Sequence, residues 1–250
     1  MVNIGFIGCG KMAGAIIKSL VKSETVSAEN ILASKSSPDN LEEISHKLGI
    51  KITLNNSETA QFGNIIFIAV KPNQVKSVLE EIRDKITADK LVVSIAAGVK
   101  TSFIESCLPE GTRVIRVMPN TPVLVNEGMA GICSGKNAKT SDIEAVQKIF
   151  NAAGKSVIVN ENKIDIVTAI SGSGPAFFYK VINDIARAGE KLGLDYDKAL
   201  LLSIQTALGS AKMALARENS MEELISNVAT KGGCTRVGVD NMDKTDELFY

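Results

Sequence analysis

The chain has 250 residues, with 28 basic and 28 acidic side chains and a single histidine, His46. This length suits one large domain or two modest ones, and the balanced charge, without a basic stripe, gives no reason to expect a nucleic-acid partner. We find no signal-peptide pattern and no apolar run of about 18 residues, so we expect a cytoplasmic protein with no membrane span. The cysteines lack C-x-x-C spacing, so neither a metal site nor a Cys/His catalytic pair is expected; they are Cys9, Cys107, Cys133 and Cys234.

The first motif is a glycine-rich turn near the N-terminus. An apolar segment ending at Ile7 is followed by Gly8, Gly10 and Ala13, with the spacing G-x-G-x-x-A, and by an apolar helical pattern. In such a turn the first glycine permits the sharp change of direction and the second lets backbone N–H groups approach a pyrophosphate, while the third small residue lets strand and helix pack closely. The phosphate would lie at the positive end of a helix that starts near Lys11. The motif therefore predicts a dinucleotide site.

The second predicted strand, residues 30–36, indicates which dinucleotide is bound. Folds specific for NAD place an acidic residue at the end of this strand, where it binds the ribose 2′-hydroxyl. Here the strand ends in Ser34, Lys35 and Ser36, which can hydrogen-bond to a 2′-phosphate and neutralise it. The sequence therefore favours NADP(H) over NAD(H); the alternative is that these residues are only the polar residues of a loop.

Apolar segments of strand length then alternate with helical patterns. Their continuous apolar runs are typical of strands buried on both faces, and the alternation predicts right-handed crossovers and a parallel sheet. Ligands of such sheets bind at the carboxyl ends of the strands. We therefore predict an α/β fold with an N-terminal Rossmann-type domain, residues 1–160. Several strand ends should converge on one crevice, namely the glycine turn, Ser34 and residues 69–72, 95–98 and 118–122.

From about Ile164 onward only helical patterns remain, which predicts an all-helical C-terminal domain, residues 161–250. Residues 164–192 are apolar or small on nearly all sides, and residues 172–175 fit a kink where another helix crosses. A capping box at residues 220–223 predicts a further helix start. A helical domain this apolar, in a chain this short, is expected to bury its surface against a second copy.

The last motif is a glycine pair followed by a hydroxyl residue, Thr230-Lys231-Gly232-Gly233-Cys234-Thr235, at a predicted helix start. Exposed backbone N–H groups at a helix N-terminus bind anions, including carboxylates, and the threonine hydroxyl adds a donor or acceptor beside them. The motif is compatible with an anion site and equally with a plain turn between helices that ends in a threonine cap.

Taken together, six segments make the chain resemble one family, pyrroline-5-carboxylate reductase, the last enzyme of proline biosynthesis. The glycine turn is generic to nucleotide-binding proteins, whereas Met-Pro-Asn-Thr-Pro and Ser-Gly-Ser-Gly-Pro-Ala are specific to the family. The resemblance covers nearly the whole chain and rests on residues 4–13, 69–72, 94–99, 116–122, 171–176 and 205–213.

The resemblance implies a cofactor site, a substrate site and a quaternary structure. The helical domain of the family forms an intertwined dimer, five dimers often form a decamer, and the active site lies between the nucleotide domain of one subunit and helices that its partner helps to build. The substrate carboxylate would lie on the backbone of Gly232, Gly233, Cys234 and Thr235. The cofactor would contact Gly8, Cys9, Gly10, Lys11, Met12, Ser34, Asn56, Ala69, Val70, Lys71, Pro72, Ile95, Ala96, Ala97 and Asn227.

Two departures from the family pattern concern the C-terminal part of the chain. The family usually has Ser-Pro before the glycine pair, where this chain has Thr230 and Lys231, which puts the rigidity of the loop and the choice of substrate in question. The chain also ends at Tyr250, earlier than most of the family, so a final helix is expected to be short or absent.

The implied reaction is hydride transfer from NADPH, with NADH as a second candidate donor, to the C=N carbon of 1-pyrroline-5-carboxylate, a small cyclic imine, which gives L-proline. Thr235 would orient the imine nitrogen through a hydrogen bond. One alternative is an enzyme acting on another cyclic imine or on a 2-hydroxy or 3-hydroxy acid; a hydroxy acid needs a general base, for which Lys180, Lys191 and Lys231 are only loose candidates. The other is a dinucleotide-binding sensor that has lost its activity, an interpretation that only the substitution at Lys231 suggests.

Overall fold

The structure is a computed structural model that describes residues 2–242 and divides the chain into two compact units. The first unit extends as far as Ala176 and the second begins at Phe177. This division falls within helix α8 (Gly174–Lys191), whereas the sequence places a domain boundary near residue 160. The two units are described separately below.

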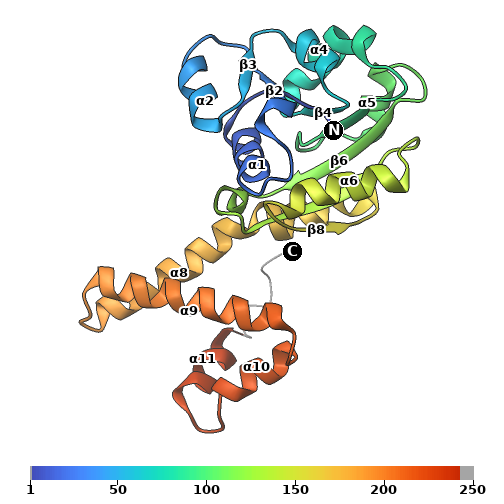
Figure 1. Ribbon diagram of the computed structural model, residues 1–250. Coiled ribbons are helices and arrows are strands. Elements are labelled where there is room, and N and C mark those ends of the chain that lie inside the picture. Colours follow the sequence, from blue (N-terminus) through green and yellow to red (C-terminus); the bar gives the residue numbers. More distant parts are fainter. Residues whose placement is uncertain (1, 243–250) are drawn as a thin grey trace. The chain divides into compact units, whose positions relative to one another are not determined.

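The first unit is built on one sheet of eight strands, with helices on both of its sides (Figure 1). The strand order is β3-β2-β1-β4-β5-β6-β7-β8, and every neighbouring pair is parallel except β6 and β7. The order reverses between β1 and β4, which is where α/β sheets of this kind bind their ligands. The strands are β1 (Ile4–Ile7), β2 (Ile31–Ser34), β3 (Lys51–Thr53), β4 (Ile65–Ile68), β5 (Leu91–Ser94), β6 (Arg113–Pro119), β7 (Gly128–Ser134) and β8 (Gly154–Ile158).

Alternate residues of the central strands form two apolar cores, one on each face of the sheet. On one face Phe6 stacks on Phe67 with 4.5 Å between ring centroids, and both side chains are fully buried. On the other face Ile7 and Ile66 are equally buried. The first core is closed by α1 (Lys11–Lys22), α2 (Leu41–Leu48) and α6 (Thr140–Asn151), and the second by α3 (Asn56–Phe62), α4 (Val75–Ile82) and α5 (Thr101–Cys107).

The sheet is larger than the sequence predicts and is not wholly parallel. The missed strand β7 begins with glycine, methionine, alanine and glycine, which have a low strand propensity, and it runs antiparallel to β6. At β8 the first three residues, Gly154, Lys155 and Ser156, interrupt the apolar continuity that marked the central strands. The prediction of a parallel sheet is therefore correct for β1 to β6 and wrong at the step from β6 to β7.

Where the sequence predicts a kink, the helical segment widens instead. After α7 (Ile164–Val167), a turn at Thr168–Gly172 has the wider π-helical form, with Ser173 donating its N–H to the Thr168 carbonyl five residues earlier at 2.8 Å. Helix α8 then begins at Gly174. Turns of this kind are rare and frequently occur at functional sites.

The second unit contains four helices among its described residues. Tyr196 donates its hydroxyl proton to Asn183 at 2.9 Å and lies under the Arg187 guanidinium at 4.9 Å, which joins the start of α9 to α8. The predicted capping box is confirmed, because the Ser220 hydroxyl accepts the Glu223 N–H at 3.1 Å and the Glu223 carboxylate accepts the Ser220 N–H at 2.8 Å. Besides α8, the helices are α9 (Tyr196–Ala216), α10 (Met221–Val228) and α11 (Cys234–Met242). A final helix within 243–250 would lie outside the described residues.

Helix α9 requires a correction to the expectation that no apolar segment reaches membrane-spanning length. It has 21 residues and passes the test of length and composition for crossing a membrane, with only 11% of its most apolar window buried within the single chain. The expectation was wrong because the charged residues of this helix lie mostly near its ends, which leaves a long apolar segment between them. An exposed apolar helix is equally what an interface between subunits requires.

Candidate functional site

The glycine turn has the geometry that a dinucleotide phosphate requires. Gly8 adopts φ +96°, and a Cβ at this position would lie 2.7 Å from the Ala69 carbonyl oxygen, so only glycine fits there. Gly10 is the N-cap of α1, makes no side-chain cap and faces open space, with nothing within 4 Å of where its Cβ would be. The twelve-residue helix α1 has no acidic residue in its first turn. Its N-terminal N–H groups thus remain suited to an anion.

The loops at the carboxyl ends of β1, β4, β5 and β6 line one cleft of about 350 Å³. This matches the predicted crevice except at the end of β2, which contributes no lining residue. Lys11 and Lys71 give the cleft positive charge at its rim, because both side chains are exposed. The lining residues are Gly10, Lys11, Met12, Ala13, Ala69, Val70, Lys71, Pro72, Ile95, Ala96, Ala97, Met118 and Pro119.

Ser34 and Asn56, both predicted to contact the cofactor, lie together at the end of β2 rather than in this cleft. The Ser34 side chain is fully buried, and its hydroxyl donates to Asn56 Oδ1 at 2.7 Å. Asn56 in turn donates from Nδ2 to Glu81 Oε2 at 2.8 Å. The predicted contact between the Ser34 hydroxyl and a 2′-phosphate stays a prediction, and Lys35 and Ser36 are the more accessible residues of this strand end.

Two cysteines are buried, Cys9 in the glycine turn and Cys133 on β7, and neither has the environment of a nucleophile. Burial raises the pKa of the Cys9 thiol, while the nearby Lys35 ammonium acts in the opposite direction. Burial, with a smaller contribution from Glu161, raises the pKa of Cys133 to about 11. A thiol reacts as its thiolate, so both groups are unreactive near neutral pH. Cys9 can therefore contribute to the glycine turn through its backbone.

Sequence reasoning did not include Asn120 among the site residues, although it lies within the Met-Pro-Asn-Thr-Pro segment. The buried Asn120 amide donates to the Ser171 carbonyl and hydroxyl oxygens, each at 3.2 Å, and accepts the Met129 N–H at 2.8 Å. The Ser171 carbonyl is available because Pro175, four residues later, has no N–H to donate to it. Beside this contact, a Cβ on Gly172 would lie 2.8 Å from the Met118 methyl carbon. The two segments most specific to the family therefore pack directly on each other.

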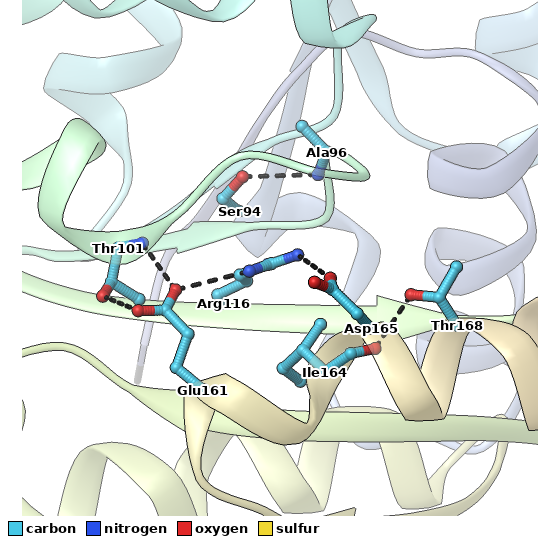
Figure 2. Close-up of polar contacts among 8 residues, drawn as sticks. All are labelled: Ser94, Ala96, Thr101, Arg116, Glu161, Ile164, Asp165 and Thr168. Carbon is cyan, nitrogen blue, oxygen red and sulfur yellow. Dashed lines mark hydrogen bonds and ion pairs between the residues drawn. The ribbon is translucent and has the colours of Figure 1, made fainter.

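Figure 2 shows a polar network around Arg116, whose strand β6 ends at the cleft. Arg116 Nη1 lies 3.4 Å from Glu161 Oε1, with only 4% of the arginine side chain exposed. The Glu161 carboxylate also accepts the Thr101 N–H at 2.7 Å and the Thr101 hydroxyl at 2.8 Å, so that it caps α5. Asp165 Oδ1 lies 3.8 Å from Arg116 Nη2 but is 90% exposed, so this pair contributes little. The network anchors the segment that follows the cleft loop Ile95–Ala97.

The second unit holds the remaining predicted site residues. Gly232 adopts φ +81°, and the Gly233 N–H donates to the Thr230 carbonyl at 3.0 Å, which closes a turn immediately before α11. Cys234 and Thr235 are exposed in the first turn of this helix. The loop thus offers fewer free N–H groups than the sequence suggested, since that of Gly233 is occupied, whereas the Thr235 hydroxyl is accessible.

Asn227 is exposed on α10, which precedes the glycine loop. The same unit contains an apolar groove of about 800 Å³ along α8 and α9. Among the residues that line it, Phe178 is 68%, Ile185 56% and Leu202 60% exposed in the single chain. An apolar surface of this kind marks an interaction site.

Two families match separate parts of the chain. The family described as pyrroline-5-carboxylate reductase dimerisation matches residues 161–248, and the family described as NADP oxidoreductase coenzyme F420-dependent matches residues 3–98. The first match covers the apolar groove and the glycine loop. The second covers the glycine turn and most of the residues that line the cleft.

Pyrroline-5-carboxylate reductases are among the proteins that are similar to this chain over nearly its whole length. The chain is 43% identical to a pyrroline-5-carboxylate reductase of Methanosarcina acetivorans, over 97% of this chain and 90% of that protein. The reductase structure from Coxiella burnetii is 35% identical, with a TM-score of 0.92, and covers 97% of this chain and 90% of its own. The Plasmodium falciparum enzyme, solved with NADP bound, is 33% identical with a TM-score of 0.86, again over 97% and 90% of the two chains.

Proposed function

Because the chain belongs to the pyrroline-5-carboxylate reductase family, we propose that it reduces 1-pyrroline-5-carboxylate to L-proline with NADPH. The observation that carries the proposal is the cleft formed by the loops after β1, β4, β5 and β6, which opens in front of Gly10 and the start of α1. The same chain carries the matched dimerisation segment. Both halves of a reductase of this family are thus present.

The residues of the cleft fit a dinucleotide. The absence of a side chain at Gly10 leaves room for a phosphate against the N-terminus of α1, and Lys11 and Lys71 supply positive charge. The loops Ala69–Pro72 and Ile95–Ala97 form the apolar walls on which a nicotinamide ring can lie. When bound, NADPH supplies a hydride to the C=N carbon, and the imine nitrogen retains the proton that makes the product a secondary amine.

The chain's own contribution to this reaction is mainly binding and orientation. A protonated cyclic imine is already a strong hydride acceptor, so no strong general acid is needed, and the single histidine, His46, is an exposed residue of α2. The loop at Gly232–Cys234 would bind the substrate carboxylate, and the Thr235 hydroxyl would orient the imine nitrogen. Holding the two reacting carbons about 3–3.5 Å apart then accounts for the rate.

The experiment is a steady-state assay that follows the absorbance of the reduced cofactor. We expect rapid oxidation of NADPH with 1-pyrroline-5-carboxylate and much slower oxidation with an unrelated cyclic imine. Turnover in the reverse direction with a 2-hydroxy or 3-hydroxy acid would favour the alternative dehydrogenase, although the candidate base Lys180 is paired with Asp184 at 2.5 Å. Binding of NADPH without turnover of any of these substrates would instead indicate a sensor.

The role of Thr235 is tested by Thr235→Val, with Thr235→Ser as the matched control that keeps the hydroxyl. We expect the valine variant to lower kcat/KM for the imine by about tenfold to a hundredfold, because one hydrogen bond to a charged group is lost, while the KM for NADPH stays unchanged. The serine variant should retain most of the activity. A valine variant with unchanged kcat/KM would remove Thr235 from the mechanism.

We also propose that the protein acts in the cytoplasm as a dimer or as a decamer of five dimers. The exposed apolar groove of the second unit supports self-association, and the match to a dimerisation family identifies the segment that would carry it. Light scattering at micromolar concentration distinguishes the two assemblies. A monomer under these conditions would contradict both.

A further inference from the structure

An acidic side chain reaches the end of β2 from a different part of the sequence. The end of this strand carries no acidic residue of its own, yet Glu81, on α4, accepts a hydrogen bond from Asn56 Nδ2 at 2.8 Å. Asn56 Oδ1 accepts the hydroxyl proton of Ser34, the last residue of β2, at 2.7 Å. Two hydrogen bonds therefore connect the strand end to a carboxylate.

Glu81 also fixes the direction of the Asn56 amide. A carboxylate can only accept hydrogen bonds, so Nδ2 must face Glu81 and Oδ1 must face the Ser34 hydroxyl. The Ser34 side chain is fully buried, Asn56 is half-buried and Glu81 is exposed. The network thus leads from the interior of the sheet to the surface beside the strand end.

The charge at this position bears on the choice between the two nicotinamide cofactors. In dinucleotide-binding folds the ribose 2′ substituent lies at the end of the second strand, where a carboxylate favours a 2′-hydroxyl and a basic side chain favours a 2′-phosphate. Here Lys35 provides the basic group at the strand end, and Glu81 opposes it. A second carboxylate near this strand end, that of Glu58, accepts a hydrogen bond from the Thr53 hydroxyl at 2.6 Å.

Resting on the proposed cofactor site, we propose that Glu81 is a specificity-determining residue that weakens the preference of this chain for NADPH over NADH. Its negative charge disfavours a doubly charged 2′-phosphate, whereas a 2′-hydroxyl experiences no such repulsion. The residue acts through charge and through Asn56, with no contribution to hydride transfer itself.

The test is Glu81→Gln, measured by equilibrium binding of NADP⁺ and NAD⁺ to the full-length protein. Glutamine can still accept the Asn56 hydrogen bond through its amide oxygen, so the substitution removes the charge and little else. We expect NADP⁺ affinity to rise about threefold to tenfold with NAD⁺ affinity nearly unchanged, and the gain to shrink at high ionic strength because salt screens exposed charges. A role in packing alone would not depend on salt.

The matched control is Glu80→Gln, which makes the same change of charge one residue earlier on α4. Glu80 is exposed and pairs with Lys76 at 3.8 Å. The Glu80→Gln variant should leave the ratio of NADP⁺ affinity to NAD⁺ affinity within about twofold of wild type. An unchanged ratio in Glu81→Gln, or equal changes in both variants, would overturn the inference. Failure of the wild-type protein to bind either NADP⁺ or NAD⁺ would overturn the inference as well. Absence of turnover with intact binding would contradict only the proposed reaction.

Discussion

The two units of this chain differ in how far they bury their apolar side chains. In the first unit the aromatic and aliphatic residues of the central strands are fully buried, Phe6 and Phe67 among them. In the second, Leu192 is 89%, Phe178 68% and Leu201 67% exposed. The central sheet of the first unit is therefore covered within the single chain, whereas the second unit exposes an apolar surface of the kind that marks an interaction site.

This difference also separates two kinds of site. The cleft of the first unit is formed by loops that follow buried strands, so its shape is fixed by the packing of the sheet. The glycine loop of the second unit joins two short helices whose apolar faces are open. The cofactor site is expected to be preformed, and the substrate site to depend on assembly.

The largest effect is expected in the first core. Phe67→Ala should lower the free energy of unfolding by about 3–5 kcal/mol, because it removes a fully buried ring that stacks on Phe6 and leaves a cavity. Urea denaturation at several protein concentrations measures this loss, which should not change with concentration. Phe178→Ala is the comparison in the second unit. A loss from Phe178→Ala that is equally large and independent of concentration would contradict the contrast between the units.

The second-largest effect is expected from a charge placed in the apolar groove. Leu202→Asp places a carboxylate in a surface that the second copy is expected to cover, which should raise the dimer dissociation constant about a hundredfold or more. Leu202→Met, which conserves volume and polarity, is the control and should leave the dimer intact. Sedimentation velocity measures both. An Asp variant that associates like wild type would show that this groove is not the interface.

The smallest effect is expected in the glycine turn, where a substitution tests whether the cofactor phosphate lies against Gly10. Gly10→Ala introduces a Cβ with no protein atom within 4 Å, so stability should change by less than about 0.5 kcal/mol while NADPH affinity falls about tenfold. Gly8→Ala is the contrasting variant, because φ +96° and the Ala69 carbonyl at 2.7 Å make it destabilising. Thermal unfolding and NADPH titration separate the two outcomes. Unchanged NADPH affinity in Gly10→Ala would mean that the phosphate does not lie against this turn.

The sequence predicted the parts of the fold that depend on local pattern. The continuous apolar strands β1, β4 and β5, the glycine turn and the capping box at Ser220 are each specified by neighbouring residues, and all are present. The strand β7 was missed because its small residues have little strand propensity and are held in place by pairing with β6. Its antiparallel direction depends on the chain reversal after Pro119, which no local pattern encodes.

The site shows the same limit. The residues that line the cleft follow from the rule that ligands bind at strand ends, and most of them were named in advance. The hydrogen bonds from Ser34 to Asn56 and from Asn56 to Glu81 were not, because Asn56 and Glu81 lie on two separate helices. Nor was the contact between Asn120 and Ser171, which depends on the carbonyl that Pro175 leaves free. Contacts between distant segments are fixed by packing, and periodicity does not report them.

The most direct test of the proposed reaction is the stoichiometry of product formation. The purified protein is incubated with NADPH and 1-pyrroline-5-carboxylate, oxidised cofactor is measured by absorbance, and proline is measured by chiral chromatography. We expect one L-proline for each NADPH oxidised. Oxidation of NADPH without proline, or binding of NADPH without oxidation, would contradict the assignment of this chain as a pyrroline-5-carboxylate reductase.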